Sequence, residues 1–252
     1  MLGRTPEVSL DYGPTLGNWA HFSEYIHCRK GISEAERNIF TFCKTLSSRP
    51  TIAIDVGGNI GQTALTLAAI GYGKIYTFEP IPETFARLMA NIKLNPQFSQ
   101  IVAVDRGIGA SPGKFTFIHN PRSPGQSKFS NANNSSGVHA AVITLDAFCE
   151  ASGIEEVALL KIDVEGFELE VLKGAESLLR RGIIKAIYTE VIALALEQAG
   201  ASPVQLYEYM AGVGYIPVDA RHLPETNVLG ADEIADRVDF GRNILWVRVR
   251  KA

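Results

Sequence analysis

The chain has 252 residues, of which 46% are hydrophobic and 20% are charged, and this composition is typical of one soluble globular domain with a substantial core. No apolar run reaches the length of about 18 residues that a membrane-spanning helix needs. The net charge of -3 gives no electrostatic reason to expect a nucleic-acid partner. The three cysteines fit neither a disulfide framework nor a zinc site, and the first residues lack the pattern of a secretory signal, so we expect a cytoplasmic protein.

The first 50 residues predict an N-terminal arm followed by one helix. Residues 1–30 carry Pro, Gly and aromatic side chains without a clear period, which indicates an irregular arm. Ser33 lies three positions before Glu36, the spacing of a capping box, and apolar residues follow at helical spacing. Pro50 prevents the helix from continuing.

From residue 51 onward, predicted strands and helices alternate, which is typical of a wound α/β domain. The predicted strands are Ile52–Val56, 74–79, Ile101–Val104, 157–163 and 183–190, with two closing strands near 214–218 and 244–249. The predicted helices are 60–70, one that begins at Pro82, 167–181 and one from Ser202 to Met210. We find no sign of a second domain and expect one domain over residues 1–252.

The alternation is interrupted between residues 109 and 141. A short predicted strand, 114–118, precedes a segment from 120 to 137 that is rich in Asn, Ser, Pro and Gly. So polar a segment buries little surface, which predicts a mobile loop at about 120–140. Loops of this kind beside a ligand often act as lids, and a loop without that role is the alternative.

The stretch IAIDVGGNIGQTAL, residues 52–65, reads as a strand, a tight glycine-rich turn and the start of a helix. Dinucleotide binding requires the pattern G-x-G-x-x-G, but from Gly57 the required positions hold Asn59 and Gln62. The segment reads instead as D-x-G-x-N-x-G, from Asp55 to Gly61. An acid at the mouth of the turn repels a pyrophosphate and suits a ligand that carries ammonium and sulfonium charges.

Four acids lie at the carboxyl ends of predicted strands: Asp55, Glu79, Asp163 and Glu190. In open α/β sheets the carboxyl ends of the strands are where ligands bind. A carboxylate at the end of the second strand can accept hydrogen bonds from both hydroxyls of a ribose, and this is the role that we predict for Glu79.

Four segments occur in this order along the chain: IDVGGNIGQTAL, YTFEP, ITLDAF and LLKIDVEGFELEVLKGA. Together they resemble the motifs of the FkbM family of S-adenosylmethionine-dependent methyltransferases. The resemblance covers residues 52–191 approximately. It implies the Rossmann-like class I methyltransferase fold, a mostly parallel seven-stranded sheet with helices on both faces and a terminal antiparallel hairpin. It also implies O-methylation of a hydroxyl on a sugar, glycan or secondary metabolite.

The resemblance assigns residues to S-adenosylmethionine. Carried over by position, the turn residues Asp55, Gly57 and Gly61 line the methionine part, and Glu79 holds the ribose hydroxyls. Asn59, in the same turn, is also expected to bind the cofactor. Asp105 lies near the adenine, and Asp163 and Glu165 lie beside the methyl donor. Structural alternatives are an ordinary loop acid for Asp105, a helix cap for Asp163 and a favourable charge at a helix start for Glu165. Glu168 and Glu170 are expected to be solvated.

A base that removes the proton of the acceptor hydroxyl assists methyl transfer. Asp163 and Glu165 are the candidates, and His139 and His119, which flank the polar loop, are weaker ones. A divalent cation that bridges Asp163 and Glu190 is an alternative, but no metal site is part of the prediction.

The sequence thus predicts a methyltransferase with a small-molecule or glycan acceptor. A nucleotide-dependent oxidoreductase and a cofactor-binding module without catalysis remain as alternatives. No motif identifies the acceptor, and none indicates the oligomeric state.

Overall fold

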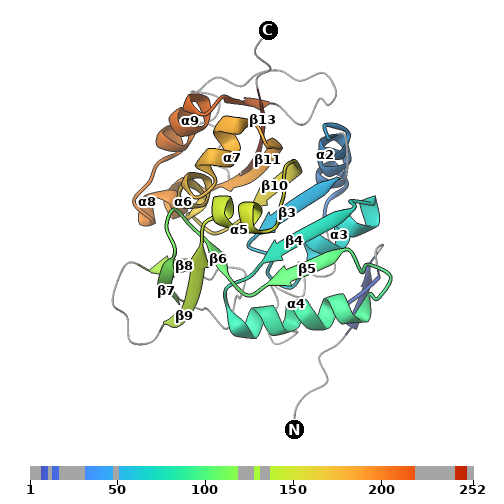
Figure 1. The fold of residues 1–252 in the computed structure, drawn as a ribbon. Helices are drawn as coiled ribbons and strands as arrows, with labels where there is room; N and C mark the ends of the chain where they lie inside the picture. The colour runs from blue at the N-terminus through green and yellow to red at the C-terminus, as the bar shows by residue number, and fades with distance from the viewer. Residues whose placement is uncertain are drawn as a thin grey trace.

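The computed structural model describes residues 7–10, 13–16, 32–47, 51–118, 128–130, 137–218 and 242–248. A seven-stranded sheet occupies the centre of this part of the chain (Figure 1). Its strands are β3 (Ile52–Val56), β4 (Lys74–Phe78), β5 (Ile101–Val104), β10 (Val157–Ile162), β11 (Ile184–Val191), β12 (Tyr215–Val218) and β13 (Arg242–Arg248). They are arranged in the order β12-β13-β11-β10-β3-β4-β5.

Neighbouring strands of this sheet are parallel except for the two pairs that β13 makes with β11 and β12. The predicted fold class and the predicted terminal antiparallel hairpin are therefore confirmed. Because β3 is central and the order reverses beside it, the carboxyl ends of β3 and β10 form the crevice in which such sheets bind ligands.

Helices cover both faces of the sheet. On one face, α2 (Glu34–Thr45) and α3 (Gln62–Ile70) pack over a core that includes Phe40, Leu65 and Leu159. On the other face, a larger core lies beneath α5 (Leu145–Ala151), α6 (Glu168–Lys173), α7 (Glu176–Arg181) and α9 (Pro203–Gly212). Two more helices are α4 (Pro82–Leu94), beside β5, and α8 (Ala193–Gln198), directly after β11.

Several local predictions are confirmed by the caps of the helices. The Oγ atom of Ser33 accepts a hydrogen bond from the backbone N–H of Glu36, whose carboxylate accepts one from the N–H of Ser33, which completes the capping box. Gly71 ends α3 with φ of 89°, and Pro82 occupies the first turn of α4. Glycine and proline therefore set these boundaries as the sequence predicts.

The predicted helix 167–181 is wrong as a single element. The chain forms α6 and α7, separated at Gly174 and Ala175. The carboxylate of Asp146, far away in sequence, accepts hydrogen bonds from the backbone N–H groups of Ser177 and Leu178. This tertiary contact satisfies the start of a second helix, and a local pattern does not reveal it.

A second, four-stranded sheet consists of β6 (Gly107–Ile108), β7 (Gly113–Ile118), β8 (Lys128–Ser130) and β9 (Val138–Ile143), in the order β6-β9-β7-β8. The sequence predicted only β7, and β8 lies inside the predicted polar loop. Residues 119–127 and 131–136 of that loop lie outside the described residues, so its predicted role as a lid stays a prediction.

The N-terminal arm also departs from the prediction of an irregular segment. Two strands, β1 (Glu7–Leu10) and β2 (Gly13–Leu16), pair antiparallel within it. The short helices α5 and α8 were not predicted either, because six or seven residues carry too little periodicity.

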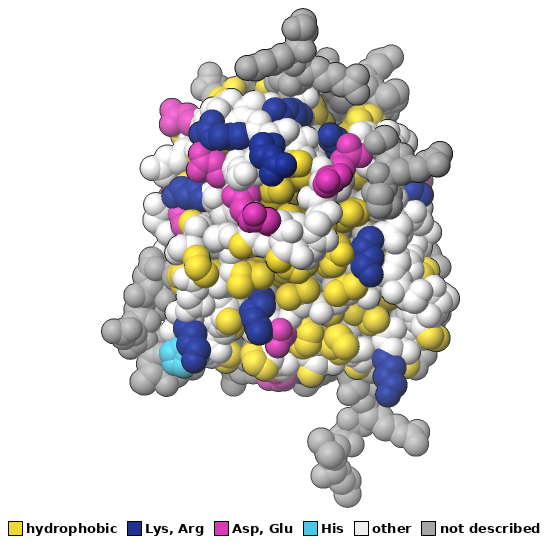
Figure 2. All heavy atoms as spheres, viewed as in Figure 1, with side chains coloured by type: hydrophobic (Ala, Val, Ile, Leu, Met, Phe, Trp, Pro, Cys, Tyr) yellow, Lys and Arg dark blue, Asp and Glu magenta, His cyan; other side chains and the backbone are white. Residues whose placement is uncertain are grey.

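Figure 2 shows one face of the molecule, on which basic and acidic side chains are interspersed. Two ion pairs join Lys173 to Glu170 in α6 and Arg180 to Glu176 in α7. Among the described residues, no helix combines the length and apolar character needed to cross a membrane.

Candidate active site

The turn after β3 has the torsions that its glycines allow. Gly57 has φ of 86°, Asn59 has 46° and Gly61 has 96°, all in the left-handed region. A Cβ atom on Gly57 would overlap the backbone carbonyl of Asp163, which follows β10. Gly57 is therefore required both for its torsion and for the close approach of two strand ends.

A buried polar row runs beneath this turn across three neighbouring strands. Asp55 lies opposite Lys161 of β10 on one side and opposite Thr77 of β4 on the other. The hydroxyl of Thr77 donates a 2.9 Å hydrogen bond to Oδ2 of Asp55, and Nζ of Lys161 lies 3.8 Å from Oδ1. Burial raises the pKa of Asp55, and the charge of Lys161 opposes this rise.

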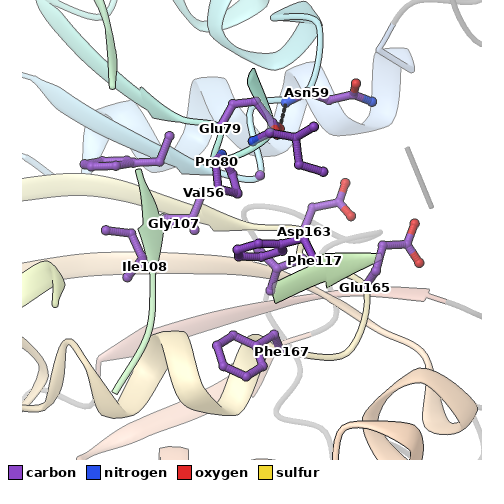
Figure 3. Close-up of a pocket in the computed structure, with 14 residues that line it drawn as sticks. Val56, Asn59, Glu79, Pro80, Gly107, Ile108, Phe117, Asp163, Glu165 and Phe167 are labelled. Carbon is purple, nitrogen blue, oxygen red and sulfur yellow. Dashed lines mark hydrogen bonds between the residues drawn. The ribbon is translucent and has the colours of Figure 1, made fainter. Parts of the chain in front are cut away.

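Glu79, the first residue after β4, connects the turn to the neighbouring strand end. Its Oε2 atom accepts a 3.0 Å hydrogen bond from the backbone N–H of Asn59, and its Oε1 atom accepts one of 2.9 Å from Ile81 (Figure 3). Burial raises the pKa of Glu79 to about 7, although these two N–H groups oppose the rise.

A first pocket of about 710 Å³ opens beside Glu79 (Figure 3). Its walls come from the ends of β3 and β4, from β6 and β7 of the small sheet, and from the loop after β10. The lining residues are Val56, Gly57, Asn59, Phe78, Glu79, Pro80, Ile81, Gly107, Ile108, Phe117, Asp163, Val164, Glu165 and Phe167. Mostly apolar walls with a few polar groups are typical of a small-molecule site.

A second pocket of about 690 Å³ adjoins the first and shares Gly57, Asn59 and Asp163 with it. It lies on the side of α2 and β13 and is more polar. Its other lining residues are Ile32, Glu36, Gly58, Ile60, Gln62, Thr63, Lys161, Glu190 and Asn243. The two pockets therefore lie on either side of the turn and of Asp163.

Three carboxylates meet at this division. Asp163, Glu165 and Glu190 each offer an oxygen atom, and these atoms all lie within 4.8 Å of one another. Lys161 donates a 2.9 Å hydrogen bond to Oδ2 of Asp163, so this carboxylate already has a cation as its partner. Burial lowers the pKa of Lys161, but the charges of Asp163 and Asp55 outweigh this effect and raise it above its ordinary value.

Glu190 occupies the end of β11, opposite Asn243 of β13. Burial and the negative charge of Asp163, together with a hydrogen bond between the two side chains, raise the pKa of Glu190 to about 8. Carboxylates with a pKa near the working pH are suited to transfer protons.

The loop between β10 and α6 is held by Glu168, and the prediction that this side chain is solvated is wrong. Glu168 is 1% exposed, and its Oε1 atom accepts hydrogen bonds from the N–H groups of Val164, at 3.3 Å, and Gly166, at 3.0 Å. Between them, Glu165 adopts a left-handed φ of 53°. Burial raises the pKa of Glu168 to about 7, although the backbone donors oppose the rise.

Five of the predicted site residues come together around the two pockets: Gly57, Asn59, Glu79, Asp163 and Glu165. In Figure 3 the carboxylates of Asp163 and Glu165 point toward the same side. This grouping follows from the ends of β3, β4 and β10, which the sheet places side by side.

Four other predicted residues do not line either pocket. Asp55 is fully buried beneath the turn, and Gly61 begins α3 with its backbone facing Leu88. Asp105 is exposed and forms a 2.6 Å ion pair with Arg106. His139 is exposed on β9, where its Nδ1 atom lies 3.1 Å from the hydroxyl of Thr116. The fifth such candidate, His119, lies outside the described residues.

Sequence reasoning missed Lys161, Phe117 and Phe167 as parts of the site. A lysine inside an otherwise apolar strand, LLKID, is a signal that a buried acid lies nearby, because an unpaired buried charge is strongly unfavourable. The two phenylalanines carry no comparable signal, since a local pattern does not separate pocket walls from core.

Comparison with known proteins agrees with this geometry. The model of the methyltransferase FkbM domain matches residues 55–217, more than half of the chain. The chain is 29% identical over 174 residues to methyltransferase sdnD of Sordaria araneosa, which covers 56% of this chain and 67% of that protein. It is 32% identical over 127 residues to hexuronic acid methyltransferase AglP of Haloferax volcanii, which covers 50% of each.

Among solved structures, the methyltransferase FkbM of Methylobacillus flagellatus has the same fold, with a TM-score of 0.51 and 16% identity. This match covers 84% of the chain and 47% of that structure, so the chain spans about half the length of this protein and of the archaeal relative. With the turn, the acidic strand ends and the sheet order in agreement, the chain belongs to the FkbM family of methyltransferases.

Proposed function

We propose that this protein transfers the methyl group of S-adenosylmethionine to a hydroxyl group of a sugar or a related small molecule. The observation that carries the proposal is the pair of adjoining pockets, with Glu79 in the wall of the first and three carboxylates where the two adjoin. S-adenosylmethionine, when bound, supplies a methyl group that its sulfonium already activates for transfer.

The residues of the site fit this cofactor. The carboxylate of Glu79 faces the first pocket, where it can accept hydrogen bonds from ribose hydroxyls, and apolar residues such as Ile81 and Ile108 offer walls for the adenine. Within the described residues, Oδ1 of Asn59 is buried without a hydrogen-bond partner, so it is available to accept one from a ligand. The carboxylates between the pockets favour the positive charges of the methionine part.

The same acids favour a neutral acceptor over an anionic one. Asp163, Glu165 and Glu190 repel a second carboxylate, whereas a hydroxyl can donate a hydrogen bond to any of them. Polar side chains such as Gln62, Thr63 and Asn243 line the second pocket and suit the other hydroxyls of a sugar. A relative named for a hexuronic acid supports a sugar as the acceptor, but not a neutral one.

Catalysis by this chain consists of orientation, exclusion of water and removal of a proton. The turn at Gly57 and the loop held by Glu168 set the backbone on either side of the reacting atoms. Phe117 and Phe167 cover the first pocket with apolar surface. Alignment of two reactants in this way lowers the barrier because it removes their freedom of motion before the reaction.

The test has two steps. Calorimetry with S-adenosylmethionine and with NAD decides the cofactor, since tight binding of NAD alone would indicate an oxidoreductase. A panel of hexosides and hexuronosides with methyl-labelled S-adenosylmethionine then decides the acceptor. We expect label in a methyl ether that is stable to alkali. Label that alkali removes would show a methyl ester on a carboxylate and contradict the proposal for a hydroxyl.

A cofactor-binding module without catalysis is the second candidate. It predicts binding of S-adenosylmethionine that survives Asp163→Ala and no labelled product with any member of the panel.

A further inference from the structure

We infer that Glu190 is the base that accepts the proton of the acceptor hydroxyl, a role that the sequence left to Asp163, Glu165 or His139. The inference rests on the proposed function, because it assigns one residue to the proton transfer in that reaction.

The three carboxylates differ in the pocket that they line. Glu190 lines the second pocket, whereas Glu165 lines the first and Asp163 lines both. With the nucleoside placed in the pocket of Glu79, the second pocket, on the side of Glu190, is the space left for the acceptor. Glu190 and Asp163 therefore face this space, whereas Glu165 does not.

The candidate bases also differ in their partners and surroundings. Asp163 is held by Lys161 at 2.9 Å, so its Oδ2 atom already has a cation as its partner. His139 lies on β9 with an exposed side chain and outside both pockets. Among the side chains that the structure describes, the charged groups around Glu190 are Asp163, Glu165 and Lys161 from β10 and its loop, and Glu36 of α2 across the second pocket, while β13 contributes the neutral Asn243.

These surroundings give the carboxylate of Glu190 a proton affinity that suits a base. With a pKa raised to about 8, Glu190 binds a proton more strongly than an ordinary carboxylate does. A sulfonium placed beside it lowers this pKa, because a nearby positive charge favours the ionised form. Binding of the cofactor therefore releases the proton of Glu190 and leaves the base ready.

The step balances without another reactant. The acceptor oxygen forms a bond to the methyl carbon while the carbon–sulfur bond breaks, and its electron pair stays on sulfur. The proton of the hydroxyl passes to a carboxylate oxygen of Glu190 and then to water. The products are a methyl ether, S-adenosylhomocysteine and a proton.

The test compares Glu190→Gln with Glu197→Gln, a matched change at an exposed position of α8. Calorimetry at pH 7 in buffers of different ionisation enthalpy counts the protons released on binding. For the wild type and for Glu197→Gln, we expect S-adenosylmethionine to release roughly half a proton more than S-adenosylhomocysteine, whose sulfur is neutral. Glu190→Gln should remove this difference and keep the affinity for S-adenosylhomocysteine, which shows that the variant is folded.

Turnover on the same panel of glycosides should fall by about 100-fold or more in Glu190→Gln, the usual contribution of a general base. Turnover within about threefold of the wild type, an unchanged proton release, or lost affinity for S-adenosylhomocysteine would each overturn the inference. So would activity that a chelator abolishes and Mg²⁺ restores. A wild type that does not bind S-adenosylmethionine would instead contradict the proposed function.

Discussion

The backbone N–H of Asn59 donates a 3.0 Å hydrogen bond to Oε2 of Glu79, which joins the glycine turn after β3 to the end of β4. The other carboxylate oxygen of Glu79 accepts from Ile81 at the start of the next segment. One side chain thus fixes two loops and also faces the first pocket.

Glu79→Ala should weaken the binding of S-adenosylmethionine about tenfold or more, because it removes both backbone contacts and the expected acceptor for the ribose hydroxyls. Isothermal titration calorimetry measures this change. Glu83→Ala, at an exposed position in the first turn of α4, is the control and should bind as the wild type does. Equal affinity for Glu79→Ala and the wild type would remove Glu79 from the cofactor site.

Asp105→Ala should leave the affinity for S-adenosylmethionine within about twofold of the wild type. The side chain of Asp105 is 64% exposed and pairs with Arg106, so its deletion changes only a weak surface ion pair. Calorimetry on the same scale as for Glu79→Ala gives the comparison. A large loss would restore the role near the adenine that the sequence predicts for Asp105.

Gly57→Ala should unfold the protein or reduce its free energy of unfolding by about 3 kcal/mol or more, because the new Cβ overlaps the carbonyl of Asp163 in a left-handed torsion. Gly153→Ala is a matched control, since Gly153 also has a positive φ, of 64°, but open space around it. That variant should lose only about 1 kcal/mol from strain. Urea denaturation measures both, and similar losses would show that the close contact is unimportant.

Lys161→Met should destabilise the fold by about 3 to 5 kcal/mol, because it leaves the buried Asp55 without the cation beside it. The double variant Asp55→Asn with Lys161→Met should recover part of the loss, as it removes the uncompensated charge. Lys173→Met, which breaks an exposed pair with Glu170, should change the free energy of unfolding by less than about 1 kcal/mol. Denaturant unfolding measures these free energies. If the double variant recovers none of the loss, the pairing of Asp55 with Lys161 is refuted.

Glu168 should make stability depend on pH in a defined direction. Its pKa is about 7 in the folded protein and about 4.5 in the unfolded chain, so the folded state binds more protons between these values. The contribution of Glu168 is fully present below pH 4.5 and is lost as the pH rises through 7. It amounts to roughly 3 kcal/mol at most.

Glu168→Gln should remove this dependence and keep the oxygen that accepts from Val164 and Gly166, whereas Glu168→Ala should lose both bonds and methyl transfer. Melting temperatures between pH 4.5 and 8, together with the transfer assay, separate the two variants. A parallel pH dependence in Glu168→Gln and the wild type would contradict the assignment.

The parallel part of the main sheet is predictable from the sequence because β3, β4, β5, β10 and β11 are mostly apolar runs, each with an acid at or just after its end. β3 and β5 match the predicted bounds, and Pro82 and Gly71 mark helix boundaries correctly. The small sheet is not predictable in this way. β6 has two residues and β8 three, and their pairing with β9 and β7 joins segments that no local pattern connects.

The site is predictable where it depends on strand ends and not where it depends on tertiary contacts. Glu79, Asp163 and Glu165 follow β4 and β10, so sheet topology alone brings them to one edge. The burial of Glu168 depends on a loop that folds back on it. The position of Asp105 outside the pocket depends on the path of the chain from β5 in the main sheet to β6 in the small sheet. Such details require the coordinates of several elements at once.

The pairing of Asn243 with Glu190 has a consequence for biosynthesis. β13 inserts between β11 and β12, yet it is the last of the described strands to leave the ribosome. Until it emerges, β11 has an open edge and the second pocket lacks the wall that Asn243 provides. A nascent chain can therefore complete the pocket of Glu79 during translation, whereas the second pocket is completed only after residue 243 has been made.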